Sequence, residues 1–181
     1  MKKLFFGLFL FVLVFMAFRA GELSAGKGLL PNQKMLHVGI IVEDINSSLN
    51  RWVKLLGLET VPEVHVAEGH HTNPTHYKGK PSDAKAKLVF IKLDNIQIEL
   101  IEPIGETPSH WKNFLDQNGE GVHHFAFEVE GMGEHYFESF NESGMPILQH
   151  GGWNGGEYGY MDSVDSLAVT IELIEDYNRK K

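Results

Sequence analysis

Hydrophobic and polar residues alternate along several short segments of this chain, which is typical of β-strands that bury one face. One such segment runs from His37 to Val42, and a second with the same order of residue types runs from His124 to Val129. Further strands are expected after each of them. They cover residues 60–67, 86–93 and 96–102 in the first half of the chain and residues 147–150, 158–162 and 168–174 in the second half.

A helical spacing of apolar residues follows each opening strand. In the first half, Asp44 can cap a helix whose apolar positions extend from Ile45 to Leu56, and Gly57 can end it. In the second half, the residues from Met132 to Phe140 have helical spacing before Gly144, although no clear N-cap precedes them. Each half is therefore predicted to form a βαβββ unit.

The segment between the two halves predicts a short helix. Thr107 and Pro108 form an N-cap and N1 pair, and the helix is expected to extend to residue 118. Two stretches without clear periodicity, residues 69–85 and 151–159, are expected to be loops, the second of them at a ligand entrance. The histidine-rich first stretch can cover a cleft, lie solvated at the surface, or form a metal site of its own.

The two halves also repeat each other in their chemistry. The first opens on a strand that begins with His37 and closes on a strand that contains Glu99, and the second does the same with His124 and Glu172. An internal duplication explains this repeat. The predicted fold class is therefore α+β, with two βαβββ modules that form a concave cleft.

Strand alternation decides which way these side chains point. In the first opening strand His37 shares a face with Gly39, and in the second His124 shares a face with Ala126, while the larger apolar residues lie on the other face. The closing strands separate each Glu from its apolar neighbours in the same way. Each half is therefore expected to project one His and one Glu from the concave face of its sheet.

If the halves pair by pseudo-symmetry, two imidazoles and two carboxylates converge. Burying two carboxylates without a cation is costly, whereas two neutral imidazoles, two carboxylates and one divalent ion sum to zero charge. The alternative is four ordinary strand residues, but their matched placement in both copies favours a shared site. The predicted cofactor is one divalent ion, with Zn, Ni, Co, Mn and Fe all compatible with the ligand types. The predicted ligands are His37, Glu99, His124 and Glu172.

The N-terminus predicts a targeting signal. Lys2 and Lys3 precede an apolar run from Leu4 to Phe18, and a small residue at Ala25 suits cleavage. The run is shorter than the about 20 residues of a membrane-spanning helix. We therefore expect an exported protein, periplasmic or secreted, or a membrane-anchored one if the signal is not cleaved. The expected organisation is a signal peptide at 1–25, a linker at 26–34 and one domain at 35–178, with module one at 35–103, a linker helix at 107–118 and module two at 121–175.

Composition narrows the range of partners. The chain has 16 Lys and Arg against 24 Asp and Glu, a formal net charge of −8, and no Cys. An acidic surface repels nucleic acid and anionic lipid, so neither is expected as a partner, nor is stable membrane association after signal cleavage. The absence of Cys excludes a thiolate nucleophile and a zinc–cysteine site. A small-molecule substrate is the expected partner, and assembly as a homodimer stays open.

Two stretches resemble a known family. The segment IELIEPIGETPSHWKNFLDQNGEGVHHFAFEVEGM (residues 98–132) resembles the part of methylmalonyl-CoA epimerases that joins their two modules, and LHVGIIVEDINSSLNRWVKLLGLE resembles the family's opening strand and helix. The likeness extends over residues 35–175. The chain thus resembles the vicinal oxygen chelate superfamily, also called glyoxalase/bleomycin resistance/dioxygenase-like, in its branch of glyoxalase I and methylmalonyl-CoA epimerase.

The resemblance implies the same four metal ligands and a lyase or isomerase, including epimerases. In such enzymes a divalent ion acts as a Lewis acid on a substrate carbonyl or a pair of neighbouring oxygens, a carboxylate removes the adjacent proton, and an enolate or enediolate forms on the metal. This implies Glu172 or Glu99 as the base. His123 precedes the ligand position and is expected to point to the helix side.

The chain departs from familiar members of the family in its small number of arginines and in its expected export. After the signal, only Arg51 and Arg179 remain as arginines, which disfavours glutathione because its carboxylates are usually bound by Arg. Export argues against a coenzyme A thioester. Two alternative functions are an extradiol-type dioxygenase that uses iron and a non-catalytic small-molecule binding protein of the same fold. Trp153, Tyr158 and Tyr160 are expected either to line the pocket or to pack in the core.

Overall fold

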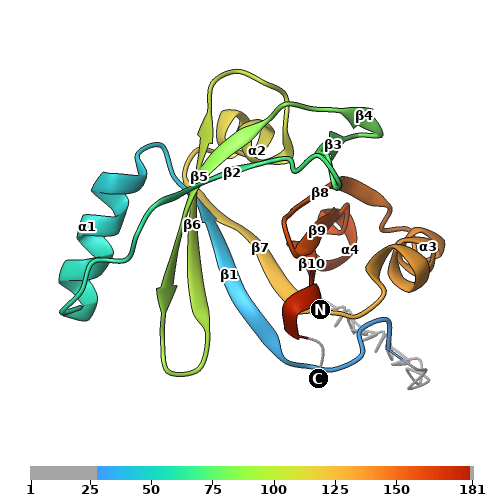
Figure 1. Cartoon of the computed structure of the whole chain (residues 1–181), viewed down its shortest axis with the longest axis horizontal. Coiled ribbons are helices and arrows are strands. Elements are labelled where there is room, and N and C mark those ends of the chain that lie inside the picture. Colours follow the sequence, from blue (N-terminus) through green and yellow to red (C-terminus); the bar gives the residue numbers. More distant parts are fainter. Residues whose placement is uncertain (1–27, 180–181) are drawn as a thin grey trace, which may run out of the picture.

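The computed structural model describes residues 28–179, in which ten strands form a single curled, mixed sheet (Figure 1). The predicted signal peptide at 1–25 lies outside the described residues and stays a prediction. In chain order the elements are β1 (Met35–Ile41), α1 (Ile45–Leu56), β2 (His65–Glu68), β3 (His76–Tyr77), β4 (Lys80–Pro81), β5 (Lys85–Lys92), β6 (Gln97–Ile104), α2 (His110–Asn118), β7 (Gly121–Glu128), the π-helical turn η1 (Met132–Tyr136), α3 (Phe137–Glu142), β8 (Ile147–Trp153), β9 (Gly156–Met161), α4 (Val164–Leu167), β10 (Thr170–Asp176) and the 3-10 turn η2 (Tyr177–Arg179).

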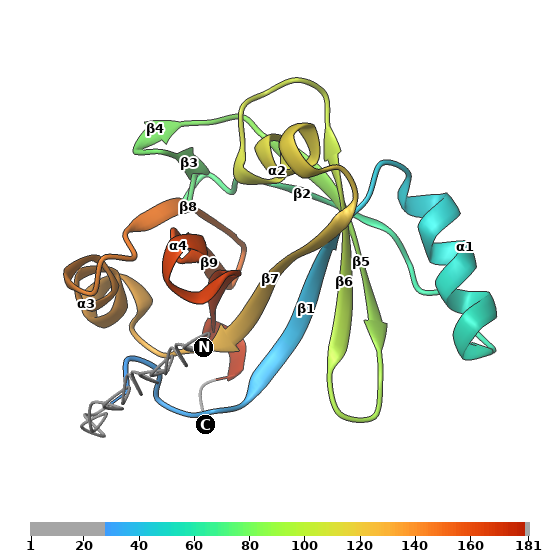
Figure 2. The same cartoon turned by 180° about the vertical axis from the view of Figure 1, so that it is seen from behind.

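The sheet has the strand order β2-β5-β6-β1-β7-β10-β9-β8-β3-β4. The opening strands β1 and β7 are antiparallel neighbours at its centre, and each is flanked by the closing strand of its own module, β6 or β10, in parallel. Figures 1 and 2 show α1 on the outside of one half and α3 on the outside of the other, with the sheet curling between them. The predicted α+β fold of two βαβββ modules around a concave cleft is confirmed.

The two modules have the same internal register. In the first, Gly39 of β1 pairs with Glu99 of β6, and in the second, Ala126 of β7 pairs with Glu172 of β10. Because side chains of paired strand residues point to the same face of a sheet, each Glu lies on the face of the His that is two residues before its partner. The duplication inferred from the sequence is thus also present in the strand pairing.

Local signals explain the first helix. The side chain of Asp44 accepts a hydrogen bond from the backbone N–H of Ser47 at 2.7 Å, and Gly57 ends the helix in the left-handed conformation with φ 65°. Ile45 and Leu49 are buried against the sheet. On that side they pack in a cluster with Val42, Val89, Ile91, Ile98 and Leu100.

The linker helix α2 begins two residues later than the sequence suggests. Ser109 is its N-cap and accepts a hydrogen bond from the N–H of Lys112 at 3.0 Å, so the expected cap at Thr107 and Pro108 is wrong. The N–H of His110 donates to Gln149 of β8 at 2.7 Å. This contact attaches the start of the helix to the second module.

The stretch expected to be a loop at 69–85 contains two short strands. β3 pairs with β8 of the second module, with His76 opposite His150, and β4 pairs with β3. An insertion in module one therefore extends the sheet of module two. Residues 151–159 likewise form the end of β8 and the start of β9 instead of a loop. Within residues 28–179, no helix is long and apolar enough to cross a bilayer.

Candidate metal centre

The structure brings the four predicted ligands together. His37 and Glu99 reach the centre from β1 and β6, and His124 and Glu172 reach it from β7 and β10. One donor atom from each lies within 4.8 Å of every other, and all four side chains are buried. Within residues 28–179, it is the one group in which three or more His, Asp or Glu side chains lie close enough together to hold a metal ion. The histidines of the insertion form no such group there, because His70 contacts the His71 ring while His76 stacks on His150.

The distances between the donor atoms fit a single ion. The Nε2 atoms of His37 and His124 are 3.0 Å apart, and Oε2 of Glu172 lies 2.9 and 3.0 Å from them. Oε2 of Glu99 lies 3.2 and 3.3 Å from the same nitrogens. Two donors that each bind an ion at about 2.1 Å and at a right angle stand about 3.0 Å apart. The observed spacing is therefore that of neighbouring ligands around one metal.

A second sign of a cation site is an unsatisfied oxygen. Oε2 of Glu99 is buried and has no hydrogen-bond partner among the described residues. A buried carboxylate oxygen without a partner is costly, and a bound cation removes this cost. The donor set, two imidazoles and two carboxylates, also suits Zn, Ni, Co, Mn or Fe.

The four side chains shift one another's pKa values. Burial opposes a charge on His37, but the neighbouring carboxylates of Glu172 and Glu99 outweigh this and raise the pKa of His37 from 6.5 to about 10. The pKa of His124 is raised too: burial opposes it, and Glu172 and Glu99 outweigh burial. The pKa values of both carboxyls are lowered by the two histidines, against burial. The carboxylates thus hold positive charge at this point, as protons on the imidazoles or as a metal ion.

Behind the predicted ligand His124, the rings of His123 and His110 are buried against each other. Nδ1 of His124 lies 2.9 Å from Nδ1 of His123, whose ring packs against His110 and Phe114 of α2. Burial lowers the pKa of His123 well below 6.5, so its ring is neutral. If Nε2 of His124 binds a metal, its Nδ1 carries the proton and donates to His123, which fixes the tautomer. His123 therefore lies on the helix side and contacts a predicted ligand.

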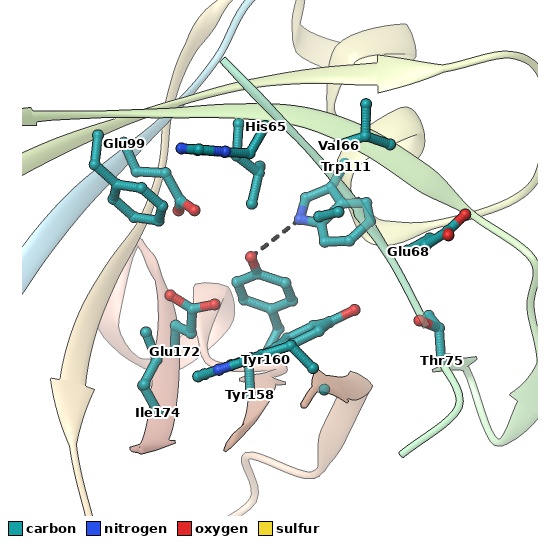
Figure 3. A pocket seen from close by; sticks show the side chains of 15 residues that line it. His65, Val66, Glu68, Thr75, Glu99, Trp111, Tyr158, Tyr160, Glu172 and Ile174 are labelled. Atoms are coloured by element: carbon teal, nitrogen blue, oxygen red, sulfur yellow. Dashed lines mark hydrogen bonds between the residues drawn. The ribbon is translucent and has the colours of Figure 1, made fainter. Parts of the chain in front are cut away.

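Beside the centre is a cavity of about 410 Å³, a size common for small-molecule sites (Figure 3). Glu99 and Glu172 face one another at one side of it, and Tyr160 points its hydroxyl towards Trp111, which donates a hydrogen bond to it at 3.0 Å. The cavity is lined by His65, Val66, Ala67, Glu68, Thr75, Leu88, Phe90, Glu99, Trp111, Gly152, Trp153, Tyr158, Tyr160, Glu172 and Ile174.

The sequence left the role of three aromatic residues open, and the structure places Trp153, Tyr158 and Tyr160 in the cavity wall. Sequence reasoning missed Phe90 and Trp111. Phe90 had a signal, because its neighbours in the alternating strand, Val89 and Ile91, are buried under α1, which turns Phe90 towards the concave face. Trp111 had none, since only the packing of α2 on the sheet brings it there.

Comparison with known proteins gives the same picture. The sequence model of the glyoxalase/bleomycin resistance protein/dioxygenase superfamily matches residues 36–161. An uncharacterised protein of Bacillus subtilis, YqjC, is 24% identical over 143 residues, which are 77% of this chain and 89% of that protein. An ethylmalonyl-CoA/methylmalonyl-CoA epimerase of Cereibacter sphaeroides is 30% identical over 103 residues, which are 55% of this chain and 63% of the epimerase.

Among solved structures, the methylmalonyl-CoA epimerase of Mycobacterium tuberculosis has the same fold. It superposes with a TM-score of 0.56 at 20% identity, and the match covers 84% of this chain and 93% of that one. The family model covers well over half of the chain, which includes the opening strand, the linker helix and the start of the second module. The resemblance found in the sequence is therefore confirmed, and the chain belongs to the glyoxalase/bleomycin resistance protein/dioxygenase superfamily.

Proposed function

We propose that this protein is a divalent-metal-dependent isomerase or lyase that moves a proton at a carbon next to a carbonyl group. The observation that carries the proposal is the buried convergence of two imidazoles and two carboxylates at the edge of a cavity of about 410 Å³. His37, Glu99, His124 and Glu172 would hold the ion. When bound, the ion supplies Lewis acidity that makes the neighbouring C–H bond more acidic.

The chain itself supplies the proton acceptor. Both Glu99 and Glu172 line the cavity, so either carboxylate is within reach of a substrate carbon placed there. Return of the removed proton to the opposite face of the same carbon produces an epimer. Its return to a neighbouring atom produces another isomer.

The relatives support this reaction type. The family includes epimerases named for methylmalonyl-CoA, one of which is 30% identical to this chain over the matched region. Epimerisation next to a thioester carbonyl is the same kind of proton movement. We extend this reaction type, and not the substrate of the relatives, to this chain.

We also propose that the protein works outside the cytoplasm. The support is the sequence of the N-terminus, where two lysines precede an apolar run and a small residue suits cleavage. N-terminal sequencing of the protein purified from culture medium or periplasm tests this proposal. A mature N-terminus near residue 26 is the expected result, and retention in the cytoplasm contradicts it.

The reaction is tested by elemental analysis and hydrogen exchange. We expect about one equivalent of divalent metal per chain, and solvent deuterium incorporation into a member of a panel of 2-oxo acids, thioesters, hemithioacetals and vicinal diketones. The Glu99→Gln and Glu172→Gln variants keep an oxygen ligand but cannot accept the proton, and the variant that keeps metal and loses exchange identifies the base. Glu59→Gln, an exposed position on the outside, is the matched control.

Three outcomes contradict the proposal. The first is purified protein that takes up no stoichiometric metal, and the second is exchange that persists in both glutamine variants. The third is consumption of oxygen with catechols in the presence of ferrous iron, which would favour the dioxygenase alternative.

A further inference from the structure

The wall of the cavity beside the metal centre is apolar and aromatic. In the part of the chain that the structure describes, none of the 15 residues that line it is Lys or Arg. Besides two tyrosines, its ionisable side chains are three glutamates and one histidine, and two of those glutamates belong to the candidate metal centre. The rest of the wall consists of aromatic, aliphatic and small residues, namely Phe90, Trp111, Trp153, Tyr158, Tyr160, Val66, Ala67, Leu88, Ile174, Gly152 and Thr75.

The apolar character continues to the mouth of the cavity. Val66 is 60% exposed, and Phe90 and Trp153 are each 40% exposed, although all three are large hydrophobic residues. Exposed apolar residues that meet at the rim of a concave site are typical of a surface that binds an apolar ligand. These three positions therefore extend the apolar wall to the entrance.

Charges of both signs lie beside the wall. Lys85 forms an ion pair with Glu68 at the rim at 2.5 Å. A neighbouring hollow shares Phe90, Trp153 and Ile174 with the cavity, and it is lined by two lysines, Lys34 and Lys92, and by two aspartates, Asp94 and Asp176. An entering carboxylate or phosphate would lose its hydration and meet no Lys or Arg side chain among the 15 described residues of the wall, and this desolvation is costly.

One hydroxyl group in the wall, that of Tyr160, can donate a hydrogen bond to a ligand. Tyr160 is buried, and its hydroxyl oxygen accepts the hydrogen bond from the Trp111 indole. This leaves the hydroxyl proton of Tyr160 for a second partner. A neutral acceptor, such as a carbonyl or ether oxygen, satisfies this donor without bringing charge into the cavity.

From these observations we infer that the substrate is an uncharged small molecule with an apolar, aromatic-sized body and two neighbouring oxygens, and that it is not an acyl coenzyme A or another anion. The inference rests on the proposed function for the two oxygens, which belong at the metal centre. The aromatic side chains of the wall suit a flat hydrophobic body, because ring-to-ring packing adds to the burial of apolar surface.

A matched pair of probes tests the inference. Phenylpyruvate carries a carboxylate next to its ketone, and its methyl-ketone analogue has an acetyl group in place of that carboxylate, so the two differ in charge and little in shape. Two of the three tryptophans of the chain line the cavity, so quenching of tryptophan fluorescence in the zinc-loaded full chain reports binding. We expect the neutral analogue to bind at least about tenfold more tightly than phenylpyruvate and than methylmalonyl-CoA.

A charge introduced at the mouth should reverse this preference. Val66→Lys places a cation at the exposed rim of the cavity without removing a buried side chain. We expect it to weaken binding of the neutral analogue and to strengthen binding of phenylpyruvate. Val61→Lys is the matched control, because Val61 is 57% exposed and does not line the cavity, and it should change neither affinity.

The inference and the proposed function fail in different ways. If phenylpyruvate, methylmalonyl-CoA or a cationic phenethylamine binds as tightly as the neutral analogue, the inferred substrate class is wrong, even if deuterium exchange occurs on one of them. If the neutral analogue binds preferentially but no member of the panel exchanges hydrogen, the substrate class stands and the proton-transfer proposal is contradicted. If the neutral analogue does not bind at all, the inference is overturned.

Discussion

Gly39 of β1 lies opposite His124 of β7 in the antiparallel pair at the centre of the sheet. A methyl group added to Gly39 would overlap the His124 ring, so the ring of one module occupies space that the other module leaves empty. His37 lies opposite Ala126 in the same pair. Each histidine is thus accommodated by a small residue of the opposite module.

This relationship predicts the effect of a single added methyl group. We expect Gly39→Ala to displace the His124 ring and to lower metal affinity at least about tenfold, a loss typical of disturbed ligand geometry. Isothermal titration with Zn²⁺ measures it. The control is Gly133→Ala, where an added Cβ meets nothing within 4 Å. Unchanged affinity in Gly39→Ala would show that His124 does not bind the metal in this position.

Removal of the histidine behind His124 should weaken the metal centre without removing a ligand. His123→Phe keeps an aromatic ring but removes the Nδ1 atom that lies 2.9 Å from Nδ1 of His124. We expect metal affinity to fall by about 10- to 100-fold, the usual effect of losing a partner of a metal-binding histidine. His123→Asn, which can accept the same hydrogen bond, should restore part of the affinity.

The control for this series is His71→Phe, since His71 is exposed and lies in the insertion. Equal metal affinity in His123→Phe and the wild type would contradict a positioning role for His123. A fall in thermal stability without a change in affinity would assign His123 to packing alone.

The metal-free protein should lose stability as the pH rises. The pKa of His37 is raised from 6.5 to about 10, so its contribution is complete below pH 6.5 and is lost as the pH rises towards about 10. The pKa of Glu172 is lowered from 4.5, so its contribution is present above pH 4.5 and is lost as the pH falls below that value. Maximum stability of the chelator-treated protein is therefore expected between about pH 4.5 and 6.5.

Thermal unfolding of the chelator-treated protein across this range tests the expectation. Saturating metal should reverse the trend above pH 6.5, because the metal replaces the proton on His37 and binds more tightly as protons are lost. A melting temperature of the metal-free protein that is equal at pH 6 and pH 9 would contradict the charge arrangement described above.

The N-cap of α2 gives a prediction about stability. Ser109 is buried and caps the helix, whereas Thr107 lies outside it. Ser109→Ala should lower the free energy of unfolding by about 1 kcal/mol, the usual cost of a lost N-cap, and Thr107→Ala should change it little. Urea unfolding of the two variants compares the positions directly, and a larger effect at Thr107 would contradict the observed cap.

The part of the fold that the sequence predicts is the part that local patterns determine. The faces of β1, β6, β7 and β10 follow from an alternation of two residues, and the repeat of this pattern places His37 and Glu99 with His124 and Glu172. The α1 helix follows from Asp44 and Gly57, which act within one turn of its ends. These features need no knowledge of what packs against them.

Long-range contacts determine the features that the sequence does not predict. The strand β3 forms because His76 and Tyr77 find an unpaired edge at β8, about 70 residues away in the chain, and no local signal specifies that partner. The start of α2 depends on Gln149, which accepts a hydrogen bond from the His110 N–H. Trp111 reaches the cavity wall only through the packing of that helix.

The shared register of the two modules limits which substitutions their central strands tolerate. Each module supplies two of the four predicted metal ligands, and the His124 ring of module two occupies the space that Gly39 of module one leaves empty. A substitution in β1 or β7 must therefore be sterically compatible with side chains of the opposite module. A change at Gly39 or Ala126 therefore requires a compensating change in the opposite module, whereas a substitution in the exposed part of the insertion does not.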